Sequence, residues 1–389
     1  MNRYIATCKI GLESLVATEL RSLGIEVEAV LDARVIFRGD WFDMARACIW
    51  LRTAERVLMI VTEFGAESFD ELYCGVKAVR WSDYIPRNAF IHVNGKSAKS
   101  KLFAVSDCQS ITKKAIVDSL FASYHTANLP ETGDEIIIEA GLLRDVATIA
   151  LDCCGAGLSR RGYRTWNVAA PIAETLGAAI VMLARYNKDT VLVDPMCGSG
   201  TMPIEAAMIA RNMAVGANRS FAAEKWSFLS GAPFKFAREQ ARDSVLDITP
   251  EITGSDIDPR AIDVCKRHAK KAGVQIRFLT RPLAEFVSPA ESGIIVCNPP
   301  YGERLMERRE AESLYRSMRT IFDGLPHWDK NIIVAHKDFE RIYGKKADKR
   351  RKLSNGGLTC TLYRYFAEQG FIKPRSRDED SDGVSTELV

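Results

Sequence analysis

The sequence has no run of apolar residues as long as a membrane span, and its first residues lack the pattern of a signal peptide. Its ten cysteines include no Cys-x-x-Cys pair, and its five histidines are isolated. Zinc sites need closely spaced Cys or His ligands, and structural disulfides belong to oxidising compartments. We therefore expect a cytoplasmic protein with reduced thiols and no metal ion.

A strong charge of one sign is also missing, because the formal net charge is only +3 over 389 residues. Such a small excess does not by itself indicate a nucleic-acid partner. The apolar content of 47% is ordinary for a soluble protein. The length suits two or three domains, each with a core of its own.

A short motif, Asn298-Pro299-Pro300-Tyr301, follows the apolar run 294–297, which predicts a buried strand. Two consecutive prolines cannot continue a sheet ladder, since neither has an N–H to donate. We therefore expect a stiff turn, named here the proline elbow, at the edge where open α/β sheets bind ligands. The Asn298 amide oxygen and the Pro299 carbonyl could accept both protons of an exocyclic base amine, with Tyr301 stacked on the base. Alone, the motif is equally compatible with an ordinary turn.

A β-branched strand upstream, 191–193, runs into a loop with two glycines, 195–200, and then into a helix. We name residues 195–200 the glycine loop. It lacks the Lys of a phosphate-binding loop and the G-x-G-x-x-G spacing of a dinucleotide site. An Asp at the strand end before Gly-x-Gly resembles the first motif of class I S-adenosylmethionine-dependent methyltransferases. The residues that this resemblance assigns to the cofactor are Asp194, Pro195, Cys197, Gly198, Ser199, Gly200 and Thr201.

Two acids follow a further predicted strand, 252–255. We expect Asp256 to accept hydrogen bonds from the ribose hydroxyls of the cofactor and Ile257 to lie against the adenine. Asp258 suits a helix cap, with Pro259 at the first helical position. A cap is also the alternative role of Asp256. We place Asn298 of the proline elbow beside the cofactor as well.

Basic residues gather in three places: 95–114, 160–164 and 341–352, the last with seven Lys or Arg against one Asp. Any one cluster could be solvated surface, but three around a base-amine motif favour RNA or DNA. We expect residues 95–101 and the third cluster to lie in loops, Lys113 and Lys114 to lie on a helix, and a tight turn at Asn355-Gly356. Fastening the connector to the catalytic domain is an equally good role for Tyr163. The candidate RNA-binding residues are Lys96, Lys99, Lys101, Lys113, Lys114, Arg161, Tyr163, Arg164, Lys349, Arg350 and Arg351.

The whole layout resembles the THUMP-domain RNA guanine-N2 methyltransferases of the bacterial 23S ribosomal RNA type. The strings that carry this resemblance are 161–164, 170–176, 194–201 and 298–305. It implies an α/β fold class, in which ferredoxin-like and THUMP α+β domains precede a Rossmann-like class I methyltransferase domain. The implied division is a ferredoxin-like domain at 1–65, a THUMP domain at 66–155, a connector at 156–175, the methyltransferase domain at 176–370 and a disordered tail at 371–389.

The resemblance implies transfer of a methyl group from S-adenosylmethionine to the N2 amine of a guanine in RNA, with 23S rRNA as the first candidate. One alternative is a DNA adenine-N6 or cytosine-N4 methyltransferase, which uses the same four-residue motif. A second is a non-catalytic RNA-binding or ribosome-assembly protein. There is one departure from the pattern, because residues 277–283 lack an acid for the adenine amine. Backbone groups at 281–283 would then read the adenine.

Overall fold

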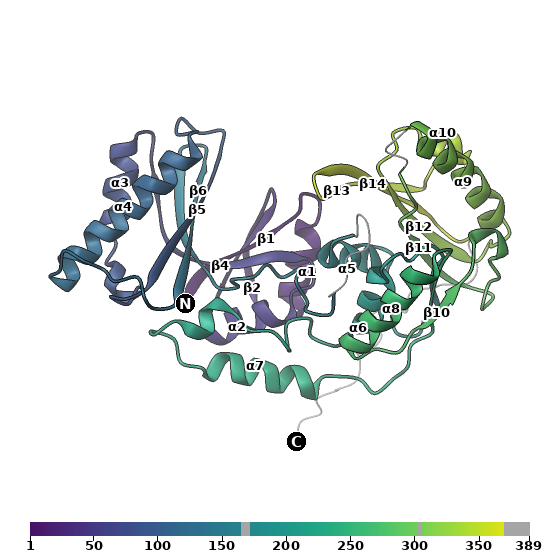
Figure 1. Cartoon of the computed structure of the whole chain (residues 1–389), viewed down its shortest axis with the longest axis horizontal. Coiled ribbons are helices and arrows are strands. Elements are labelled where there is room, and N and C mark those ends of the chain that lie inside the picture. The colour runs from purple at the N-terminus through teal and green to yellow at the C-terminus, as the bar shows by residue number, and fades with distance from the viewer. Residues whose placement is uncertain (165–171, 302–304, 369–389) are drawn as a thin grey trace, which may run out of the picture.

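The computed structural model describes residues 1–164, 172–301 and 305–368, and these form two seven-stranded sheets (Figure 1). The first sheet has the order β2-β3-β1-β4-β7-β6-β5. Its strands are β1 Asn2–Cys8, β2 Glu26–Leu31, β3 Arg34–Gly39, β4 Ala54–Gly65, β5 Phe90–Ala98, β6 Glu135–Leu143 and β7 Val146–Asp152. Its helices are α1 Glu13–Ser22, α2 Trp41–Trp50, α3 Phe69–Lys77 and α4 Val105–Tyr124.

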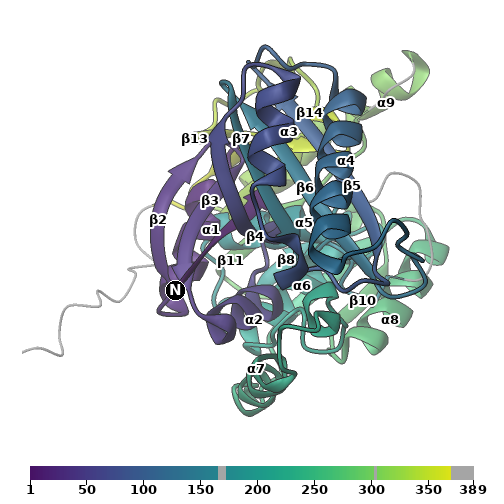
Figure 2. The same cartoon turned by 90° about the vertical axis from the view of Figure 1, so that its left-hand side faces the viewer.

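Strand β4 joins the first two predicted segments into one sheet. The sequence predicts a short strand at 56–61, but β4 is twelve residues long and pairs antiparallel with both β1 and β7. Segments 1–65 and 66–155 therefore share one continuous sheet, whereas the sequence predicts a separate domain for each. Helices α3 and α4 lie side by side over its β4–β5 end (Figure 2).

The second sheet has the order β10-β9-β8-β11-β12-β14-β13. Its strands are β8 Leu192–Asp194, β9 Ile252–Asp256, β10 Arg277–Thr280, β11 Gly293–Cys297, β12 Trp328–Val334, β13 Lys349–Asn355 and β14 Leu358–Tyr365. Its helices are α5 Glu174–Leu183, α6 Thr201–Ala210, α7 Ala232–Asp243, α8 Pro259–Ala272, α9 Leu305–Asp323 and α10 Phe339–Tyr343. Strands β10, β9, β8, β11 and β12 are parallel, whereas β14 pairs antiparallel with both β12 and β13. This doubly wound arrangement confirms the predicted fold class.

Local chemistry explains where the helices of this sheet begin and end. The Asp258 carboxylate accepts the Arg260 N–H at 2.9 Å, and Pro259 opens α8, as the sequence predicts. Gly273 ends α8 with a φ of +73°, a conformation that costs other residues more. Gly200 precedes α6 with a φ of +81°.

Two predictions about the basic segments are wrong. Lys96 lies inside β5, not in a loop, because β5 extends to Ala98. The cluster 341–352, also expected in a loop, contributes to α10 and to the edge strand β13. The predicted tight turn is confirmed, since Asn355 pairs with Leu358 and the two glycines between them have positive φ. The predicted tail lies outside the described residues.

The two sheets are docked through close contacts rather than through a loose linker. The Gly216 N–H donates to the Ile49 carbonyl at 2.8 Å, and a Cβ on Gly216 would lie 2.8 Å from the Ile49 Cα. Helix α2 packs on α7, and the Trp41 ring lies 6.0 Å from that of Phe228. Among the described helices, none combines the length and the apolar character that crossing a bilayer requires.

Candidate functional site

Three strand ends of the second sheet bring the predicted motifs to one edge. Strands β9, β8 and β11 are parallel neighbours, with Asp194 opposite Gly254 and Val193 opposite Ile295. Because β8 ends at Asp194 and β11 ends at Cys297, the glycine loop and the proline elbow leave neighbouring strands at the same edge. Strand order reverses at β8, which is where open α/β sheets bind their ligands.

The glycine loop offers its backbone, not its side chains. Gly198 and Gly200 have φ values of +51° and +81°, and a Cβ on Gly200 would lie 3.1 Å from the Cys265 sulfur. The side chains of Ser199 and Thr201 are buried, with their hydroxyl oxygens 3.3 Å apart. The N–H groups at the start of α6 remain the natural partners of an anionic group.

Asp194, at the end of β8, is buried directly before the glycine loop. Its side chain is fully buried, and its Oδ1 accepts the Met196 N–H at 3.2 Å. Its Oδ2 is buried without a hydrogen-bond partner. Burial raises the pKa of this carboxyl well above its usual range, and the charge of Asp256 adds to the effect. An unpartnered buried carboxylate beside a loop of N–H groups fits the ammonium and carboxylate of an amino-acid moiety.

Asp256 fixes the neighbouring loops as well as ending β9. One carboxylate oxygen accepts the Gly198 N–H at 2.9 Å, and the other accepts the Asp258 N–H at 3.0 Å. Each oxygen has a second lone pair, so ribose hydroxyls could bind alongside these contacts. Ile257 is 72% exposed and could cover an adenine. The Arg281 N–H donates to the Asp256 carbonyl at 2.9 Å, so that N–H is already engaged.

The proline elbow is held by two tyrosine hydroxyls. The Tyr301 hydroxyl donates to the Asn298 Oδ1 at 2.5 Å, and the Tyr315 hydroxyl donates to the Pro300 carbonyl at 2.8 Å. Asn298 and Tyr301 are half-buried, whereas Pro299 is buried and Pro300 exposed. Burial raises the pKa of the Tyr301 hydroxyl, and the nearby Cys360 thiol contributes. The Tyr301 hydroxyl is thus held in its protonated form, in which it donates to Asn298.

A surface pocket of about 380 Å³ opens beside Tyr301, which forms part of its lining. Its other polar walls come from Arg308 on α9 and from residues 336–338, which follow β12. None of these residues is among the candidates predicted from the sequence. The apolar run 332–335, which leads directly into residues 336–338, is the signal that could have indicated them.

The structure contradicts RNA contact for Arg161 and Tyr163, whose side chains are buried, whereas Arg164 is half-buried and its RNA contact stays a prediction. The Arg161 guanidinium is 1% exposed and lies 3.4 Å from the Glu205 carboxylate, which also accepts the Tyr163 hydroxyl at 3.1 Å. Arg164 donates to the Thr201 hydroxyl at 2.6 Å. The alternative predicted for Tyr163, fastening the connector to the catalytic domain, fits its contact with Glu205. Glu205, the centre of this network, was missed because nothing in its sequence surroundings marks it.

The other basic candidates differ in whether another side chain already pairs with them. Arg351 donates to the Ser14 hydroxyl at 3.1 Å, which ties β13 to the first sheet. Acidic side chains lie within ion-pair distance of Lys96, Lys101, Lys113 and Arg350. Lys99, Lys114 and Lys349 are exposed and have no acidic partner among the described residues.

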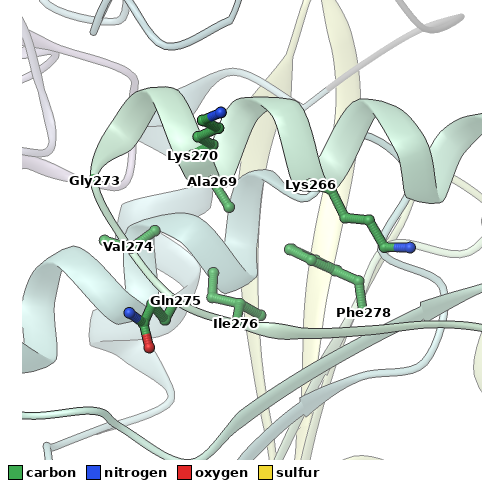
Figure 3. A pocket seen from close by; sticks show the side chains of 8 residues that line it. All are labelled: Lys266, Ala269, Lys270, Gly273, Val274, Gln275, Ile276 and Phe278. Atoms are coloured by element: carbon green, nitrogen blue, oxygen red, sulfur yellow. The ribbon is translucent and has the colours of Figure 1, made fainter.

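A second pocket, of about 450 Å³, lies under helix α8 and is separate from this edge (Figure 3). Figure 3 shows Ile276 and Phe278 beneath the helix that carries Lys266 and Lys270. Because Ile276 precedes β10, the pocket extends toward the amino end of the strand and not toward Asp256. Within the described residues, no group of three or more His, Cys, Asp or Glu is arranged to hold a metal ion.

Three family models match the chain in sequence order. They describe a RlmL ferredoxin-like domain at residues 3–58, a THUMP domain at 66–152 and an RMKL-like methyltransferase domain at 161–364. YpsC of Bacillus subtilis, provisionally named an RNA methyltransferase, is 42% identical over 98% of this chain and all of its own length. The ribosomal RNA large subunit methyltransferase K/L of Syntrophotalea carbinolica is 35% identical over 95% of the chain. The chain spans 54% of that protein's length.

Solved structures share the whole architecture. That of a predicted N6-adenine-specific DNA methylase from Listeria monocytogenes has a TM-score of 0.89 and 42% identity, covering 94% of this chain and 96% of the other. That of SMU.472, provisionally named a methyltransferase and complexed with SAH, has a TM-score of 0.88 and 39% identity, covering 95% of this chain and 99% of the other. The chain therefore belongs to the RMKL-like methyltransferase family, with a RlmL ferredoxin-like domain and a THUMP domain ahead of its methyltransferase domain.

Proposed function

We propose that this protein transfers the methyl group of S-adenosylmethionine to the N2 amine of a guanine in RNA, with 23S rRNA as the first substrate to test. The observation that carries the proposal is the arrangement of the proline elbow and the glycine loop at the ends of adjacent parallel strands. The solved relative that holds SAH, the product of such a transfer, supports this cofactor.

The buried Asp194 carboxylate and the glycine-loop N–H groups would hold the methionine part of the cofactor, and Asp256 would hold the ribose. The bound cofactor would supply an electrophilic methyl group on its sulfonium. The proline elbow would bind and orient the base. The Asn298 Oδ1 and the Pro299 carbonyl accept the two N2 protons, and the ring of Tyr301 stacks on the base.

This hydrogen bonding turns the amine lone pair toward the methyl group. Positive charge grows on the nitrogen during transfer, and two fixed carbonyl dipoles stabilise it. The Tyr301 hydroxyl keeps the Asn298 oxygen in place without taking a proton, since burial raises its pKa. Most of the rate enhancement then comes from alignment, and the proton leaves to solvent after transfer.

RNA is favoured over DNA by the THUMP match and by the relatives named as RNA and ribosomal RNA methyltransferases. The exposed lysines Lys99 and Lys114 of the first half suit phosphate contacts. In this proposal segments 1–65 and 66–155 grip the RNA, 156–175 connects, and 176–370 carries out methyl transfer. The name of the Listeria relative keeps DNA adenine methylation as the competing function.

The experiment is methyl transfer from labelled cofactor to rRNA from a strain that lacks the protein, with duplex DNA in parallel. Label in rRNA and none in DNA is the expected result. Asn298→Ala should nearly abolish turnover while leaving cofactor affinity, measured by calorimetry, close to normal. Asp256→Ala should weaken cofactor binding instead. Label in DNA alone would replace the proposal with its competitor, and failure of the wild type to bind cofactor would favour a non-catalytic role.

A further inference from the structure

The pocket beside Tyr301 lies on the opposite side of the elbow from the glycine loop in strand order. The loop follows β8, the elbow follows β11, and residues 335–338 of the pocket wall follow β12, the next strand. A base held in this pocket would have the elbow between itself and the glycine loop. Tyr301 lines the pocket and its hydroxyl lies 2.5 Å from the Asn298 Oδ1, so a base in the pocket would lie beside the acceptor side of the elbow.

One acid and one guanidinium face this pocket together. The Asp338 carboxylate lies 3.9 Å from the Arg308 guanidinium and 3.6 Å from that of Arg341. Neither distance is a hydrogen bond, and no described residue donates one to the Asp338 carboxylate. Its main chain is fixed, because the Asp338 N–H donates to the His336 Nδ1 at 3.2 Å. The backbone that carries the carboxylate is thus fixed, and the carboxylate oxygens accept no hydrogen bond from the described residues.

We propose that this pocket is the nucleobase subsite, in which Asp338 accepts the N1–H of guanine and Arg308 donates to its O6. The inference rests on the proposed function and names the group that would select its substrate. Guanine presents an acceptor, O6, next to a donor, N1–H, beside the reactive amine. The Arg308–Asp338 pair presents the complementary donor and acceptor.

Adenine presents the inverse pattern, with a donor at N6 and an acceptor at N1. Its N1 lone pair would face an ionised carboxylate, which can only accept. Cytosine likewise has an acceptor, N3, next to its amine. The same elbow could serve any exocyclic amine. The pocket wall would restrict it to guanine by binding guanine more tightly than adenine or cytosine.

The test compares guanine with 2-aminopurine at the mapped target nucleotide of an rRNA assembled by ligation. 2-Aminopurine keeps the N2 amine but has an acceptor at N1 and no O6. We expect wild-type kcat/KM to fall by about ten- to hundredfold for 2-aminopurine, the range of a charge-assisted contact. In Asp338→Asn the new amide can donate to N1 of 2-aminopurine, so the ratio between the two bases should shrink by about tenfold or more.

Asp189→Asn is the matched control, because Asp189 is 77% exposed on its side chain and lies outside both pockets. It removes the same charge and should leave the ratio unchanged. The Asp338 side chain caps no helix, so the variant is expected to fold. An Asp338→Asn variant that slows both bases equally would overturn the subsite. A wild type that leaves the guanine RNA unmethylated would instead overturn the proposed function.

Discussion

Replacing Tyr301 by Phe isolates the bond that orients the proposed catalytic amide. The change removes the hydroxyl that donates to the Asn298 Oδ1 at 2.5 Å and keeps the ring that lines the nucleobase pocket. A neutral hydrogen bond contributes about 0.5–1.5 kcal/mol net, and loss of a half-buried partner lies toward the upper end. With RT near 0.6 kcal/mol, this corresponds to a fall in kcat of about three- to tenfold.

The assay is single-turnover methyl transfer at saturating cofactor and RNA. The dissociation constant for cofactor should not change, because the hydroxyl contacts the elbow and not the glycine loop. Tyr124→Phe is the matched control, since it removes a hydroxyl at the end of α4 that donates to the Ile85 carbonyl at 2.7 Å, far along the chain from the elbow. An unchanged rate in Tyr301→Phe would refute the positioning role. A loss of a thousandfold or more would mean that the hydroxyl itself takes part in proton transfer.

Further predictions test the buried groups and the RNA surface. Asp194→Asn should abolish cofactor binding yet stabilise the free protein at neutral pH. Burial raises the folded pKa of Asp194, so the native state keeps a proton that the unfolded state loses. The wild type therefore loses stability as pH rises above the pKa that Asp194 has in the unfolded state. Thermal melts should show the extra stability of the variant shrinking as pH falls toward 4, near the unfolded Asp pKa of about 3.9. Equal stability of variant and wild type at neutral pH would contradict the burial of the Asp194 carboxyl. Arg161→Ala should cost about 3–5 kcal/mol in denaturant unfolding by leaving the buried Glu205 unpaired, with RNA affinity of the folded protein unchanged. Lys99→Ala should weaken RNA binding and lower its salt slope by about one; Lys101→Ala, already paired with Glu67, should change less.

The motifs at the carboxyl edge could be predicted because their chemistry is local. A pair of prolines after an apolar run, or an Asp before Gly-x-Gly, restricts the backbone without help from distant residues. The parallel order of β9, β8 and β11 then follows from the doubly wound rule, and it brings these motifs together.

Side-chain direction could not be predicted, because it depends on residues far along the chain. Arg161 and Tyr163 have the composition of an RNA contact, yet Glu205, more than forty residues later, draws both inward. The edge strand β13 was missed because its run of Lys and Arg lacks an apolar alternation, which an edge strand facing solvent does not need. The span of β4 across two predicted domains likewise depends on its partners β1 and β7.

The most direct measurement uses S-adenosylmethionine with a deuterated methyl group, RNA from a strain lacking the protein, and mass spectrometry of the digested nucleosides. The elbow, the glycine loop and the Asp338 pocket together predict that the label appears in N2-methylguanosine, and that Asn298→Ala removes it. Label in N6-methyladenosine or N4-methylcytidine, or N2-methylguanosine that persists in Asn298→Ala, would contradict this account.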